Sequence, residues 1–175
     1  MNRIKLRCHF TDRFILGFGM ILIIGYGNSL RRDDGAGPAL ARTVKERCGD
    51  GDLRVLEAHQ LAPELADEIA APDVTAVHFM DASVARDANQ DQEVPEGVEI
   101  RKLDSKALTQ SFGHHFDPST LLAYAEHLYG KHPQAWLISI PCADFDFGEG
   151  FSDAARASLA SAEEKVLELL SRLKA

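Results

Sequence analysis

The segment GYGNSLRRDDGAG, residues 25–37, decides the fold that this sequence predicts. It follows the uncharged run Ile21–Ile24, and a run of this kind that continues to Tyr26 is typical of a buried strand. Pro38 then suits the first turn of a helix that extends to Cys48. A strand, a glycine-rich turn and a helix in this order predict the first unit of an α/β sheet.

The rest of the chain continues the alternation of strands and helices. Apolar runs predict further strands at Leu53–Leu56, Val74–Met80, Val98–Leu103 and Ala135–Ile140. Helices are expected at Pro63–Ala70, at Pro118–Tyr129 with Asp117 as its N-cap, and from Ser152 to the end of the chain. The pattern therefore predicts the α/β class, with a mostly parallel sheet covered by helices on both faces.

Composition restricts the classes of function. The chain has 175 residues, of which 45% are hydrophobic and 26% charged, and a net charge of −8, which disfavours nonspecific binding to nucleic acid or to an anionic membrane. No apolar run approaches the roughly 20 residues of a membrane span. The 3 cysteines are odd in number and widely spaced, which fits a reducing cytoplasm better than a disulfide framework.

The first nineteen residues are basic and carry only a short apolar part. Met20 stands directly before the first strand, so we expect a single domain over residues 20–175 and a miscalled start over residues 1–19. A real N-terminal arm or short strand is the competing interpretation. We expect the protein to be a monomer.

The glycine loop admits a nucleotide-binding interpretation. Gly25 and Gly27 fit a dinucleotide fingerprint, but Leu30 occupies the position of its third glycine. The two acids Asp33 and Asp34 place negative charge where phosphates would lie. A nucleotide-binding module of the Rossmann type therefore stays as an alternative, with Glu57 as a possible ribose-binding acid.

A metal site is the second interpretation. In open α/β sheets, sites gather beyond the carboxyl ends of the strands, where Asp34, Asp81 and His114 are expected. Two carboxylates and an imidazole suit a divalent first-row ion. Gly35 and Gly37 allow a sharp turn after the acids.

Each of these residues also has an ordinary structural interpretation. Asn28 is expected to hydrogen-bond across the loop and hold it shut. Asp33 and Asp34 suit helix capping, Asp81 suits a turn, and either of His114 and His115 suits an ordinary loop. Cys142 at a strand end is expected to be a packed thiol rather than a nucleophile.

The combination of motifs resembles the hydrogenase maturation endopeptidases. The segment GYGNSLRRDDGAG is similar to the N-terminal signature of that family. Two later blocks resemble the family as well, QLAPELADEIAAPDVTAVHFMDAS at residues 60–83 and GHHFDPSTLLAYAEHLYGKHP at residues 113–133. The similarity covers about residues 20 to 174.

This resemblance implies a five-stranded twisted sheet between layers of helices. It implies a protease that removes a C-terminal tail from the large-subunit precursor of a nickel–iron hydrogenase after nickel has been inserted. The family's metal-contacting residues fall on Asp34, Asp81 and His114, with His115 as a competitor of His114. The first of these acids is often Glu in the family, so Asp34 is one methylene shorter. The nickel is expected to be carried by the substrate, and Asp34 and Asp81 are the candidate catalytic carboxylates.

Overall fold

Five strands form one sheet in this computed structural model, which describes residues 19–49, 51–84, 97–104 and 116–173. The strand order is β2-β1-β3-β5-β4. The strands are β1 (Met20–Tyr26), β2 (Leu53–Ala58), β3 (Val74–Val84), β4 (Glu99–Leu103) and β5 (Gln134–Cys142). The first three and β5 are parallel, and only β4 pairs in the antiparallel sense, at the edge beside β5. The prediction of a mostly parallel five-stranded sheet is confirmed.

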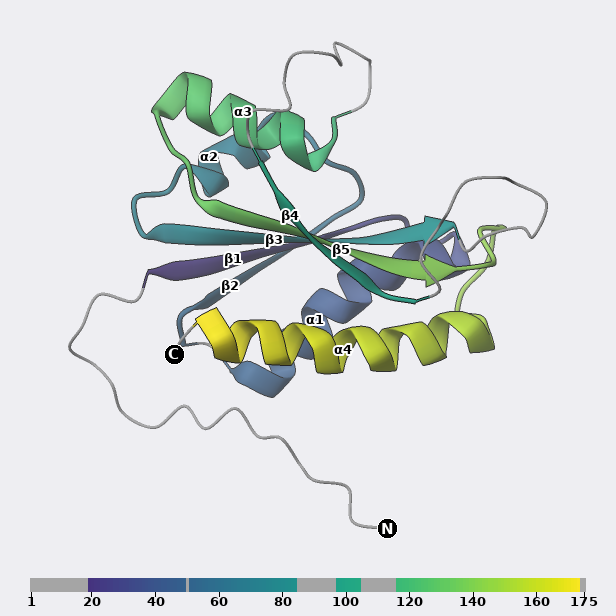
Figure 1. Ribbon diagram of the computed structural model, residues 1–175. Coiled ribbons are helices and arrows are strands. Elements are labelled where there is room, and N and C mark those ends of the chain that lie inside the picture. The colour runs from purple at the N-terminus through teal and green to yellow at the C-terminus, as the bar shows by residue number, and fades with distance from the viewer. Residues whose placement is uncertain (1–18, 50, 85–96, 105–115, 174–175) are drawn as a thin grey trace.

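Helices cover both faces of this sheet, as the sequence predicts (Figure 1). Helices α1 (Ala36–Cys48) and α4 (Asp153–Leu173) cover one face, and α2 (Leu65–Ile69) and α3 (Pro118–Tyr129) cover the other. A short 3-10 helix, η1 (Arg32–Gly35), precedes α1. Because the parallel strands alternate their side chains between the two faces, the core forms two apolar clusters, one under each helix pair.

The central strands contribute to both clusters. Ile23 and Met80 pack with α1 and α4, whereas Ile24, Val77 and Phe79 pack with α2 and α3. Strands buried on both faces need apolar residues at nearly every position, which is why Ile21–Ile24 shows no polar alternation.

The ends of α3 match the prediction in detail. Asp117 accepts a hydrogen bond from the backbone N–H of Thr120 at 2.6 Å, and Pro118 occupies the first turn. Gly130 ends the helix in the left-handed conformation, with φ of 65°. Asp117 and Pro118 therefore fix the residue at which α3 begins.

Three strands continue past their predicted ends. Strand β2 continues past Leu56 to Ala58, β3 continues past Met80 to Val84, and β5 continues through Pro141 to Cys142. The extensions of β3 and β5 pair with each other, Ser83 with Pro141 and Val84 with Cys142, so each supplies the partner that the other needs. Pro141 has no N–H group to donate, but the strand continues through it. Asp81 consequently lies within β3 and not in a turn after it.

No helix among the described residues is long and apolar enough to cross a membrane. The extension predicted at residues 1–19 lies almost wholly outside the described residues, so that prediction stays open.

Candidate active site at the carboxyl ends of the strands

The turn after β1 is closed by Asn28, as predicted. The backbone N–H of Asn28 donates to Oδ2 of Asp34 at 2.9 Å, and its Oδ1 accepts the N–H of Leu30 at 2.9 Å. Gly27 has φ of 139°, and a Cβ there would lie 2.0 Å from the carbonyl oxygen of Asp34. Only glycine permits this conformation and this approach. The turn thereby holds the Asp34 carboxylate against its own backbone.

Other glycines of the loop provide space for close packing. A Cβ on Gly25 would lie 2.5 Å from the carbonyl oxygen of Gly37, so α1 approaches β1 closely. The prediction of a sharp turn at Gly35 and Gly37 is wrong, because Gly35 has φ of −75° and Gly37 lies within α1. Gly35 instead avoids the Cα of Ser29, which a Cβ would meet at 3.0 Å.

The adjacent acids Asp33 and Asp34 have different environments. Asp33 is fully buried and accepts hydrogen bonds from the N–H groups of Ala143, Asp144 and Ser152 and from the Ser152 hydroxyl. Neither acid makes a side-chain cap to η1 or α1, so the helix-capping alternative is not realised. Asp33 therefore links the loop after β1 to the loop before α4. The Asp34 carboxylate takes no part in this link and is available to the candidate site.

The hydrogen bonds of Asp33 keep it ionised. Burial alone would raise the pKa of this carboxyl, but the bonds from Ser152, Asp144 and Ala143 outweigh burial and lower the pKa below its ordinary value. The Ser152 hydroxyl also accepts the N–H of Ala155 at 3.1 Å and so caps the first turn of α4.

Asp81 shows the opposite behaviour. Burial, together with the negative charge of Asp34, raises the pKa of Asp81 to about 6. Hydrogen bonds from the Tyr26 hydroxyl and the Ala82 N–H offset part of the effect. A Cβ on Gly37 would lie 2.3 Å from the carbonyl oxygen of Met80, so the segment that carries Asp34 lies against β3 directly before Asp81.

Tyr26 belongs to the same group of side chains. Its hydroxyl donates to Asp81, and burial and the charges of Asp81 and Asp117 raise the pKa of Tyr26 well above its ordinary value. Tyr26 packs against the cluster under α2 and α3, and Asp81 follows Val77 and Phe79 on that same face of β3. The side chains of Tyr26 and Asp81 therefore lie on the face of the sheet that α2 and α3 cover.

Cys142 is near the acids but is unsuited to nucleophilic attack. The residue is fully buried, and burial together with the charges of Asp33, Asp34 and Asp81 raises the pKa of its thiol to about 12. The thiolate is the reactive form of cysteine, so a protonated, buried thiol has no nucleophilic role. The structure agrees with the predicted packed thiol.

The nucleotide alternative is poorly supported by this loop. A phosphate needs free backbone N–H groups, but those of Asn28 and Leu30 donate within the loop, and those of Arg31 and Arg32 donate to Asn28 and Gly148. Glu57, the proposed ribose-binding acid, forms an ion pair with Arg42.

Solved structures with the same architecture have names that refer to hydrogenase maturation. The [NiFe] hydrogenase maturation protease HybD from Thermococcus kodakarensis matches with a TM-score of 0.64 and 24% identity over 86% of this chain and 98% of that chain. The maturating endopeptidase HybD from E. coli matches with a TM-score of 0.67 and 19% identity, covering 87% and 93% of the two chains. The chain has the fold of the hydrogenase maturation proteases. The maturation protease HycI from Thermococcus kodakarensis, with a TM-score of 0.60 and 24% identity over 89% and 92%, has this fold as well. No protein-family model and no curated protein sequence matches the chain.

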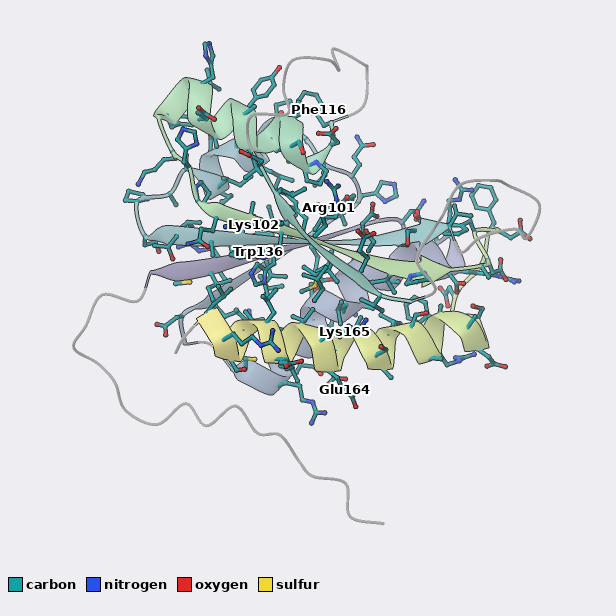
Figure 2. All side chains as sticks on the ribbon, in the orientation of Figure 1. Arg101, Lys102, Phe116, Trp136, Glu164 and Lys165 are labelled. Carbon is teal, nitrogen blue, oxygen red and sulfur yellow. The ribbon has the colours of Figure 1, made fainter. Side chains whose placement is uncertain are left out.

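The third predicted ligand of the site lies outside the described residues. His114 and its competitor His115 fall there, and among the described residues no group of three or more His, Cys, Asp or Glu side chains is placed to hold a metal ion. Phe116, the first described residue after them, lies at the start of α3 (Figure 2). It packs against the cluster on the Asp81 face, and its ring lies 5.6 Å from that of Tyr124.

Tyr26 is the site residue that the sequence analysis missed. It stands between Gly25 and Gly27, and the motif itself assigns no role to the residue at this position. Strand alternation was the available signal, because Tyr26 and Asp81 project to the same face of neighbouring strands.

Proposed function

We propose that this chain is an endopeptidase that removes a C-terminal tail from the nickel-loaded large subunit of a nickel–iron hydrogenase. The observation that carries the proposal is the placement of Asp34 after β1 and of Asp81 in the last residues of the adjacent strand β3, in a fold shared with proteins named as hydrogenase maturation proteases. Sites in open α/β sheets gather at this edge.

Asp34, Asp81 and His114 are the side chains that recognise the nickel of the substrate. Their two oxygens and one nitrogen suit a divalent first-row ion, and three ligands leave room for groups that the substrate itself supplies. Because the nickel arrives with the precursor, a precursor without nickel lacks this contact. Recognition of the metal thereby restricts cleavage to subunits that have been loaded.

Proton transfer is the task of the two carboxylates. Hydrolysis adds the oxygen of water to the scissile carbonyl carbon, and the proton that water loses must reach the departing amine nitrogen. A carboxyl with a pKa of about 6 can accept that proton and release it again near neutral pH, which suits Asp81. Activation of the water by the metal is the rival route.

A metal-binding module without peptidase activity is the second candidate, since the same side chains would serve it. The few and widely spaced cysteines also suit an enzyme of the cytoplasm.

The deciding experiment incubates the purified protein with nickel-loaded and nickel-free large-subunit precursor and weighs the products. The proposal requires a loss of mass equal to a C-terminal peptide in the nickel-loaded sample only. Binding of the precursor without any loss of mass would favour the module.

A further inference from the structure

Three large apolar side chains are exposed on segments that carry or pair with the loop and strand of the two carboxylates, and we call them the apolar rim. They are Leu30, Val84 and Phe147, with 62%, 70% and 83% of their surface exposed. Single exposed apolar residues are common on proteins, but a group beside a functional site indicates a binding surface. The other exposed large apolar residues in the described part of the chain lie on α3 and are Tyr124, Leu128 and Tyr129.

The apolar rim is held in place by backbone pairing between two loops. The N–H of Gly148 donates to the carbonyl of Leu30 at 2.9 Å, and the N–H of Arg32 donates to the carbonyl of Gly148 at 3.0 Å. The Arg31 guanidinium lies 5.7 Å from the centre of the Phe147 ring. Leu30 and Phe147 are thus presented side by side on a fixed support, which reduces the entropy lost when a partner binds.

The same loops contain the acids of the site. Leu30 and Asp34 belong to one turn, in which Asn28 bonds to both. Val84 lies three residues beyond Asp81 on β3, about 10 Å along the strand, and its side chain projects to the opposite face of the sheet. A polypeptide that contacts Leu30 and Phe147 would therefore reach the turn that holds Asp34 within a few residues.

The end of β3 offers an open strand edge at the same place. Pairing with β1 ends at Gly25 and Met80, while pairing with β5 continues to Val84 and Cys142. On the β1 side, Ala82–Val84 has no strand partner among the described residues. An extended peptide can add to such an edge through its backbone groups.

From these contacts we propose that the apolar rim and the open edge of β3 bind the segment of the precursor that spans the scissile bond, in extended form and with apolar side chains against Leu30 and Phe147. This inference rests on the proposed function, since it takes the hydrogenase precursor as the occupant.

The test measures the affinity of the purified full-length chain for the nickel-loaded large-subunit precursor from the same organism. Leu30→Ser and Phe147→Ser should each raise Kd about tenfold, as expected for the loss of a central apolar contact. Leu128→Ser is the matched control, because this side chain is 58% exposed on α3, and its Kd should equal that of the wild type. The mature subunit without its tail should bind all four proteins equally.

Three results would overturn the inference. The first is an unchanged Kd in both rim variants, and the second is a wild type that does not bind the precursor. The third is a wild-type dimer, seen in sedimentation equilibrium, that Phe147→Ser converts to a monomer. Equal urea midpoints for the variants exclude misfolding as the cause of weaker binding. The mass of the precursor after incubation tests the proposed function separately, because a chain that binds through the rim without cutting would leave this inference standing.

Discussion

The hydroxyl of Tyr26 donates a hydrogen bond to the carboxylate of Asp81 from the neighbouring strand. The pairing of Gly25 with Met80 makes the following residues, Tyr26 and Asp81, neighbours on the same face of the sheet. This bond opposes the effect of burial on Asp81. Tyr26 therefore influences the pKa of Asp81.

Tyr26→Phe should raise the pKa of Asp81 above its value of about 6, because the bond that favours the ionised carboxyl is lost. NMR titration of the Asp81 carboxyl carbon in the enzyme without substrate measures this shift. The Tyr124→Phe variant, altered on α3, serves as control and should titrate like the wild type. An unchanged or lower pKa in Tyr26→Phe would show that the bond does not influence Asp81.

Replacement of the two adjacent acids should affect stability very differently. In Asp33→Asn, an NH2 group replaces one of the two carboxylate oxygens that accept backbone N–H groups. Because this group cannot accept a hydrogen bond, we expect a loss of about 2 to 4 kcal/mol in the free energy of unfolding. Asp34→Asn should cost less than about 1 kcal/mol, because its one hydrogen bond within the loop can survive. Urea denaturation compares the two variants, and equal losses would argue against separate roles.

His78 should make the fold sensitive to mild acid. The side chain is fully buried against Trp136, neither ring nitrogen has a hydrogen-bond partner among the described residues, and burial lowers the pKa to about 4. The unfolded chain, with a pKa of 6.5, binds the proton first, so stability is complete above pH 6.5 and falls as the pH approaches 4.

The loss from His78 over this window should be about 3 kcal/mol. In His78→Phe, the unfolding free energy should change much less between pH 6.5 and 4. Urea titrations at several pH values measure both curves. Parallel curves for the two proteins would mean that another group carries the acid sensitivity.

Cys142→Ala should leave tail removal intact at a cost of about 1 kcal/mol in stability, because the thiol is buried and protonated. Iodoacetamide should likewise leave the activity of the wild type unchanged. Abolition of cleavage by either treatment, with the fold preserved, would reassign the nucleophile.

The sequence was sufficient for the sheet, the helix layers and the ends of α3, because these depend on local patterns such as Asp117 before Pro118. It was insufficient for the ends of β3 and β5, because their extensions depend on pairing between residues about 58 positions apart. The different roles of Asp33 and Asp34 depend on contacts with residues 143–152. Tyr26 was missed for the same reason, since its partner Asp81 lies on another strand.

The central claim is that Asp81 acts in the cleavage of a nickel-loaded precursor, and Asp81→Asn tests it most directly. Wild type and variant are incubated with the same nickel-loaded large subunit, and the subunit mass is measured over time. We predict that the wild type shortens the subunit by a C-terminal peptide, while Asp81→Asn, with an unfolding midpoint like that of the wild type, leaves its mass unchanged. Shortening by Asp81→Asn at the rate of the wild type would contradict this account.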